Sequence, residues 1–121
     1  MSATMKHDEI CIALTTAGSE DEAQRLARML VERRLAACVN ILPGVRSVYR
    51  WQGAVEETGE AMLVIKTSRG LADAVQAALR EAQSYDLPEF LLLSVDGGGA
   101  EYMAWLRDGL EIRPDRGSST V

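Results

Sequence analysis

Apolar residues, many of them β-branched or aromatic, are concentrated between residues 37 and 67, where they predict two long β-strands joined by a tight turn. β-Branched and aromatic residues fill the first arm, an apolar run ends the second, and Gln52-Gly53 between them is typical of a hairpin turn. Each predicted arm spans about 14 residues, whereas an ordinary strand has roughly 5–6. A hairpin of that length overshoots a small domain, so its tip, with Tyr49 and Trp51, must be buried by a partner. Another copy of the chain is the simplest one.

Shorter patterns predict a strand and a helix before the hairpin and an irregularity in its first arm. The apolar run at residues 9–16 indicates a central strand. Ser19 followed by Glu22 matches a capping box, which begins a helix predicted over about residues 20–35. The apolar face of that helix consists of Ala23, Leu26, Ala27, Leu30 and Val31. Pro43-Gly44 interrupts the first arm of the hairpin, so a bulge is expected there.

After the hairpin, the sequence predicts a second helix, a fourth strand and a short third helix. Ser68 can cap a second helix, and residues 83–88 then form a turn. Residues 89–95 predict another buried strand, and a short third helix carries Tyr102 and Trp105.

This order of elements predicts an α+β fold, a ferredoxin-like split βαβ sandwich with an extended β-hairpin. Right-handed crossovers place both main helices on one face of a four-stranded antiparallel sheet. The other face stays open and apolar, which again predicts assembly. Three copies related by a cyclic axis let each hairpin cover a neighbour's sheet edge, so a homotrimer is expected. The domain is predicted over residues 9–112, with flexible segments at 1–8 and 113–121.

Composition narrows the function. The chain has 121 residues, 47% of them hydrophobic, which fits one packed domain. Its net charge is −5 and it has no long Lys/Arg block, so nucleic-acid binding is disfavoured. No apolar run is long enough for a membrane helix and no signal peptide is recognisable, so cytoplasmic residence is expected. A disulfide between Cys11 and Cys38 is then not expected.

Complete catalytic or metal motifs are absent from the sequence. There is one histidine, His7, and no Cys-x-x-Cys, His-x-x-x-His or calcium-loop pattern. A nucleophile such as Cys38 would need an oriented base, which the sequence does not supply. We therefore expect no enzymatic activity.

Several residues remain as candidate ligands or cleft residues. Cys38 follows the basic pair Arg33-Arg34, which favours a thiolate, although a buried thiol is the commoner case. Asp86 and Glu89 flank Pro88. These carboxylates either form a solvated rim or face a cleft between subunits, where they would bind divalent cations. Lys66 either extends into solvent or pairs with a carboxylate. The candidate interface and cleft residues are Tyr49, Trp51, Glu60, Lys66, Tyr85 and Trp105.

The chain resembles the CutA family of divalent-cation tolerance proteins. The matching segments are residues 35–40 (LAACVN), 41–44 (ILPG), 47–51 with Gly53 (SVYRW and G) and 63–67 (LVIKT), followed by Tyr85, Pro88, Glu89, Tyr102, Trp105 and Leu106. The resemblance implies a ferredoxin-like fold, a tight homotrimer, residence in the cytosol, an association with tolerance of copper and other divalent metals, and no catalysis. It carries Cys38 over as a motif residue.

One departure from the family pattern concerns metal binding. The family usually has His-Pro before its Tyr-Glu-x-Pro-Glu motif, whereas this chain has Gln83 and Ser84, with Asp86 as the acidic residue. Glutamine is a weak neutral ligand, so an imidazole site is not carried over. We interpret the chain as a homotrimeric, non-enzymatic protein of metal tolerance that binds copper or another divalent cation weakly, with Cys38, Asp86 and Glu89 as candidate ligands. The alternatives are a PII-like regulatory module that binds a small anion between subunits and a scaffold for another protein.

Overall fold

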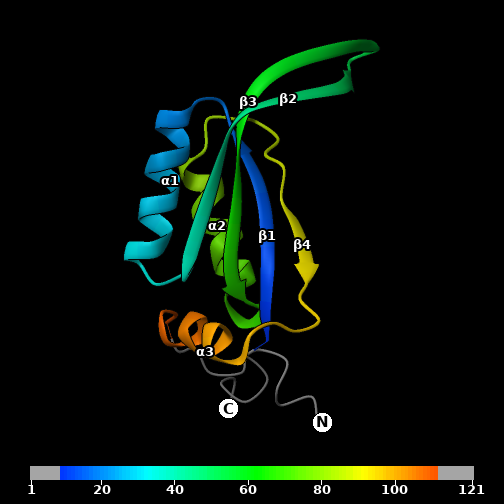
Figure 1. The fold of residues 1–121 in the computed structure, drawn as a ribbon. Helices are drawn as coiled ribbons and strands as arrows, with labels where there is room; N and C mark the ends of the chain where they lie inside the picture. Colours follow the sequence, from blue (N-terminus) through cyan, green and yellow to red (C-terminus); the bar gives the residue numbers. More distant parts are fainter. Residues whose placement is uncertain (1–8, 112–121) are drawn as a thin grey trace, which may run out of the picture.

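One antiparallel sheet organises the computed structural model, which describes residues 9–111 (Figure 1). Its strands are β1 (Ile10–Ala17), β2 (Cys38–Trp51), β3 (Ala54–Ser68) and β4 (Leu91–Ser94), in the order β2-β3-β1-β4. The helices are α1 (Glu20–Glu32), α2 (Ala72–Ala82), preceded by a 3-10 turn at Arg69–Leu71, and α3 (Ala100–Asp108). This element order confirms the predicted split βαβ fold.

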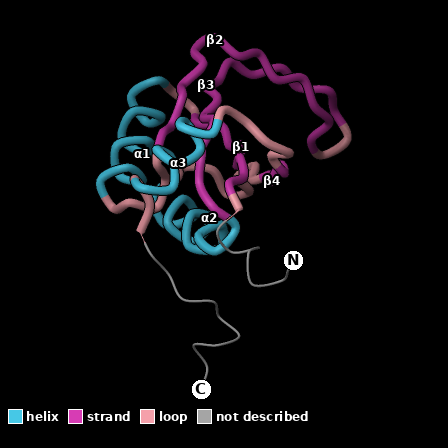
Figure 2. Tube along the Cα trace, turned by 60° about the horizontal axis from the view of Figure 1, so that its bottom comes forward, coloured by secondary structure: helices cyan, strands magenta, loops and turns pink. Residues whose placement is uncertain are grey.

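Helices α1 and α2 cover one face of the sheet, and α3 lies across the end where β1 begins (Figures 1 and 2). Their apolar stripes and the inward positions of β1 and β3 form one core, in which Leu30, Leu63 and Leu79 are 1% exposed or less. Because successive strand residues point to opposite faces, the residues between these core positions lie on the open face. The predicted one-sided arrangement is therefore confirmed.

Helix α1 begins as predicted and ends early. The Ser19 hydroxyl accepts a hydrogen bond from the backbone N–H of Glu22 at 3.1 Å, which is half of the predicted capping box. The helix ends at Glu32 rather than near residue 35, because Arg34 has φ +60° and turns the chain back. This reversal buries Leu35, which is 1% exposed. Val31 was expected on the buried face but is 41% exposed.

The hairpin turn and bulge are confirmed. Gln52 and Gly53 have φ +50° and +85°, as a two-residue turn with two left-handed positions requires. The pairing of β2 with β3 shifts between Leu42 and Val45, and Gly44 in this bulge has φ +71°. The predicted interruption at Pro43-Gly44 is therefore a bulge in a continuous strand.

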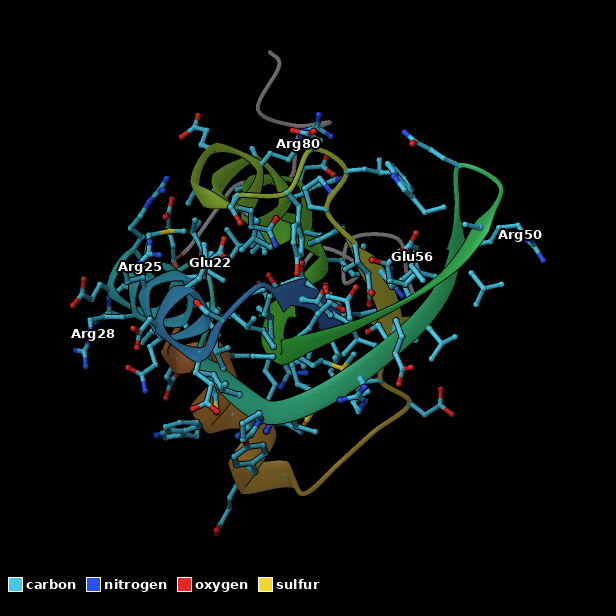
Figure 3. The ribbon with its side chains drawn as sticks, turned by 90° about the horizontal axis from the view of Figure 1, so that it is seen from above. Glu22, Arg25, Arg28, Arg50, Glu56 and Arg80 are labelled. Atoms are coloured by element: carbon cyan, nitrogen blue, oxygen red, sulfur yellow. The ribbon has the colours of Figure 1, made fainter. Side chains whose placement is uncertain are left out.

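The distal half of the hairpin stands alone. Strand β1 pairs with β3 only as far as Ala61, so residues 45–60 form a two-stranded ribbon that projects from the body (Figures 1 and 3). A two-stranded ribbon is at best marginally stable in water. Apolar side chains of this ribbon are exposed all the same: Val48 and Val55 to 66%, and Trp51 to 47%.

Two expectations about the second half are wrong. The strand predicted at 89–95 is shorter, and it is exposed rather than buried, with Leu91 at 55% and Leu92 at 41%. The reason is that β4 is an edge strand paired only with β1, and no helix of the described chain covers it. Ser68 makes no side-chain capping hydrogen bond, because the 3-10 turn separates it from α2.

Candidate functional site

A cleft of about 620 Å³ lies where the projecting ribbon leaves the sheet. One wall is the ribbon, and the other is the turn of residues 83–90, which we call the cleft turn. The residues that line the cleft are Thr16, Ser47, Val48, Tyr49, Trp51, Glu60, Tyr85, Asp86, Leu87 and Glu89. The sequence-predicted candidates Tyr49, Trp51, Glu60, Tyr85, Asp86 and Glu89 therefore come together, from two segments distant in sequence.

Glu60 is the hydrogen-bonding centre of this cleft. One carboxylate oxygen accepts a bond from the Ser47 hydroxyl at 2.6 Å, and the other accepts one from the Tyr85 hydroxyl at 2.6 Å. The first bond joins the two arms of the ribbon, and the second joins the ribbon to the cleft turn. Short bonds of this kind to an ionised carboxylate are stronger than those between neutral groups.

The cleft holds further acidic side chains around Glu60. Burial, and then the charge of Glu60, raise the pKa of Glu89 above its ordinary value. Burial and the bond to Glu60 also raise the pKa of the Tyr85 phenol, which therefore stays protonated as a donor at neutral pH. The cleft thus gathers the carboxylate oxygens of Glu60, Asp86 and Glu89, with the Tyr85 phenol as a donor to Glu60. Oxygen ligands of this kind suit hard divalent cations.

Cys38 and Lys66 lie at the other end of the open face. They are directly opposite in the pairing of β2 with β3. The Lys66 ammonium donates to the Tyr102 hydroxyl at 3.1 Å, and this bond raises the pKa of Lys66. Lys66 therefore bonds a phenol of α3, which neither sequence alternative foresaw. Trp105 stacks on Tyr102 with ring centroids 5.6 Å apart, and both aromatics are about half exposed.

The two groups of candidate ligands are well separated within one chain. Lys66, which faces Cys38, lies six residues from Glu60 along β3, which is about 20 Å at roughly 3.3 Å per residue. Over residues 9–111, no group of three or more His, Cys, Asp or Glu side chains has the geometry to hold a metal ion. The thiol and the cleft carboxylates of one chain thus do not form one metal cage. His7 lies outside the described residues.

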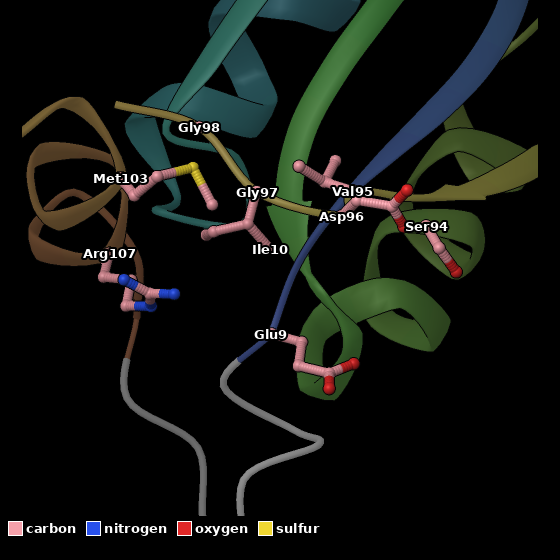
Figure 4. A pocket seen from close by; sticks show the side chains of 9 residues that line it. All are labelled: Glu9, Ile10, Ser94, Val95, Asp96, Gly97, Gly98, Met103 and Arg107. Carbon is pink, nitrogen blue, oxygen red and sulfur yellow. The ribbon is translucent and has the colours of Figure 1, made fainter. Parts of the chain in front are cut away.

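A second cavity, of about 530 Å³, lies between α3 and the start of β1 (Figure 4). Its charged lining residues are Glu9, Asp96 and Arg107, and Met103 reaches into it from α3. Glu9 is also ion-paired with Arg69 at 3.2 Å. None of the candidate site residues predicted from the sequence lines this cavity.

Gln83, the position of the family histidine, does not line the cleft. Its side-chain amide donates to the Thr15 hydroxyl at 2.8 Å and to the backbone carbonyl of Thr16 at 3.1 Å. Its role here is a contact with β1. Sequence reasoning did not find this role, and it also missed Thr15 and Ser47, because single polar residues within a strand carry no pattern.

The open face of the sheet is apolar, as predicted. Its centre is formed by outward positions of β1, β3 and β4, such as Leu14, Val64 and Leu93. Leu93 is 46% exposed and Leu42, on β2, is 44% exposed. On the ribbon, Val48 and Val55 are 66% exposed. Exposed apolar side chains that gather on one face are typical of an interaction site.

Known proteins match this chain along most of its length. Residues 11–109 match the family described as CutA1 divalent ion tolerance protein. The divalent-cation tolerance protein CutA of Pectobacterium atrosepticum is 43% identical over 99 residues, which cover 82% of this chain and 90% of that protein. The divalent cation tolerance protein (Cut A1) of Thermus thermophilus superposes with a TM-score of 0.82 at 40% identity, covering 84% of this chain and 99% of that one.

A further solved structure is described as the periplasmic divalent cation tolerance protein CutA of Archaeoglobus fulgidus. It has a TM-score of 0.82 and 31% identity, covering 84% of this chain and 99% of that one. These matches confirm the family resemblance and favour the tolerance proteins over the PII-like regulatory module. The family description names no catalytic activity.

Proposed function

We propose that this chain, which belongs to the CutA1 divalent ion tolerance family, acts without catalysis in the tolerance of divalent cations, as a homotrimer whose cation contacts are built between subunits. The observation that carries the proposal is the exposed apolar surface formed by the ribbon, the open sheet face and β4. The separation of the thiol from the carboxylates supports it, since ligands from neighbouring chains would complete either group.

Assembly is the first part of the proposal. Strand β4 is a sheet edge exposed on both faces, and the projecting ribbon is exposed around Trp51. An unpaired sheet edge and an exposed apolar ribbon are each stabilised when another chain packs against them. In a cyclic trimer, each subunit presents the same surface to a neighbour, so both features are buried in every subunit. Burial between subunits also adds stability that a chain of this size lacks on its own.

Sedimentation equilibrium at micromolar concentration tests the assembly. We expect a trimer in the unmodified protein and weakened association in Trp51→Ala, because a buried interface tryptophan contributes on the order of 2 kcal/mol or more. Arg50→Ala, the adjacent residue of the same strand, is the matched control. A monomer at this concentration refutes the assembly, and a Trp51→Ala trimer as tight as Arg50→Ala removes the tryptophan from the interface.

Weak metal contact is the second part of the proposal. Soft Cu(I) prefers a thiolate, and Cys38 is half-buried, whereas Cys11 is fully buried. Harder divalent cations prefer the oxygens of Asp86 and Glu89 in the cleft.

Competition titrations separate these ligands. We expect Cys38→Ser to weaken Cu(I) binding and Cys11→Ser to leave it unchanged. Asp86→Asn should weaken binding of a divalent cation and leave Cu(I) unaffected. Equal Cu(I) affinity in both serine variants and in the unmodified protein would remove Cys38 from the proposal.

We also propose residence in the cytoplasm. No helix within residues 9–111 has the length and apolar character of a membrane span. Since the Archaeoglobus fulgidus relative is described as periplasmic, location needs its own measurement. Fractionation of cells that express the full chain, with marker enzymes for each compartment, provides it.

A further inference from the structure

The cleft turn has almost no regular structure of its own. Residues 83–90 lie between α2 and β4, outside any helix or strand. The backbone N–H of Gln83 still bonds to Leu79 at the end of α2. Beyond that point, the hydrogen bonds that hold the turn involve side chains from β1, α1 and β3. Its position is therefore set by a few side-chain contacts.

Glu22 anchors the start of the turn. Its side chain is only 6% exposed, and it accepts bonds from the Ser84 backbone N–H at 2.8 Å and the Ser84 hydroxyl at 3.1 Å. It also accepts a bond from the backbone N–H of Gly18 at 3.1 Å. One carboxylate thus ties the end of β1, the first turn of α1 and the cleft turn together. Figure 3 shows Glu22 on the inner side of α1, whereas Arg28 points outward.

Thr15 anchors the other end of the turn. Its hydroxyl is fully buried and donates to the backbone carbonyl of Glu89 at 2.6 Å. A hydroxyl has one hydrogen, so it can donate to only one acceptor at a time. Gln83 donates its amide N–H to the same hydroxyl oxygen at 2.8 Å, which leaves the Thr15 hydrogen directed at Glu89. The two ends of the turn are thereby joined through one buried hydroxyl.

We propose that Glu22, Thr15 and Gln83 are positioning residues for the cleft. They hold the cleft turn in place, and the turn in its place sets where the Tyr85 hydroxyl and the carboxylates of Asp86 and Glu89 lie. The proposal deepens the proposed function and rests on it for the cation, because it concerns the cleft that the cation would contact. Neither Glu22 nor Thr15 lines the cleft; both act through the turn.

Hydrogen–deuterium exchange of the assembled protein, without metal, tests the positioning. In Thr15→Val, which keeps the size of the side chain and removes its hydroxyl, the amide of Ser84, whose N–H is bonded to Glu22, should exchange about tenfold faster, as expected for the loss of one buried hydrogen bond. Thr15→Ser restores the hydroxyl and should restore slow exchange. Amides of α2 and of the β1–β3 pairing should not change, since a general loss of stability would accelerate all of them.

Glu22→Gln provides the second comparison. An amide in place of the carboxylate keeps only one acceptor oxygen, so it cannot accept from the Ser84 N–H and the Gly18 N–H at once, and the Ser84 amide should again exchange faster. Glu20→Gln, an exposed carboxylate in the same helical turn, is the matched control and should behave as the unmodified protein. If Glu22→Gln does not fold, the Thr15 pair still decides the question.

Two results would overturn the positioning: unchanged exchange of the Ser84 amide in Thr15→Val, or an acceleration spread evenly over the whole sheet. Calorimetric titration with Cu²⁺ alone then separates the two proposals. Where the turn is loosened, Cu²⁺ affinity should fall in Thr15→Val and return in Thr15→Ser. Absence of Cu²⁺ binding in the unmodified protein contradicts the proposed function, while the exchange comparison still decides the positioning.

Discussion

Removing the Tyr85 hydroxyl isolates the bond that joins the cleft turn to the ribbon. In Tyr85→Phe, Glu60 loses the donor at 2.6 Å and keeps Ser47. A hydrogen bond to a charged group contributes roughly 1.5–3 kcal/mol. The cleft is open and water can replace part of this bond, so we expect a loss of about 1–2 kcal/mol in the free energy of unfolding. Denaturation by urea at one fixed protein concentration measures it, because the proposed assembly would make stability depend on concentration.

Tyr49→Phe is the matched control for this prediction. Its hydroxyl bonds the neutral hydroxyl of Thr58 at 2.8 Å on the exposed ribbon, so its removal should cost about 0.5 kcal/mol or less. In a Glu60→Gln background, Tyr85→Phe should cost less than it does alone, because the acceptor is no longer charged. Equal losses in the two phenylalanine variants, or an undiminished loss beside Glu60→Gln, would refute the charged hydrogen bond as the source of the effect.

Burial and backbone geometry support three further predictions. Burial, and then the charge of Glu60, raise the pKa of Glu89 above its ordinary value of 4.5. Glu89→Gln should therefore raise the melting temperature at pH 7, and this gain should vanish as the pH falls below 4.5, where the carboxyl is protonated in both the folded and the unfolded state. A gain that does not depend on pH contradicts this prediction. A thiol reagent should modify Cys38 in the folded protein and Cys11 only after unfolding, because Cys11 is fully buried; mass spectrometry of the labelled peptides decides. Gly44→Ala should lower the free energy of unfolding by about 1 kcal/mol, because Gly44 has φ +71°. Gly59→Ala, with open space around the added methyl group, should lower it less. Equal melting temperatures of the two variants would argue against strain at the bulge.

Local chemistry made much of the fold predictable. The turn at Gln52-Gly53 requires two left-handed residues, and the bulge at Pro43-Gly44 needs a missing donor beside a flexible position. The cap at Ser19 likewise depends on a residue three positions away. Each of these features is decided by residues close together in sequence, so each leaves a readable pattern.

The cleft was predictable only in part, because its organising contacts join residues far apart in sequence. The bond from Ser84 to Glu22 spans 62 positions, and the bond from Thr15 to Glu89 spans 74. Glu22 was read as one half of a capping box, yet its carboxylate bonds to the cleft turn instead of closing the box. The exposure of β4 was missed for a related reason. The apolar run Leu91 to Leu93 has the composition of a buried strand, whereas its exposure depends on its position at the edge of the sheet, which the local sequence does not encode.

The proposed assembly would be coupled to the cleft through the ribbon. Glu60 and Ser47 lie where the ribbon leaves the body, and Trp51 lies near its tip on the same two strands. A partner that fixes the ribbon therefore also fixes Glu60 relative to Tyr85, and so sets one wall of the cleft. By linkage, any ligand that binds the cleft more tightly in the assembled state must favour assembly by the same factor. The cleft turn supplies the other wall through contacts within one chain, so the ribbon is the wall through which a neighbouring subunit would act.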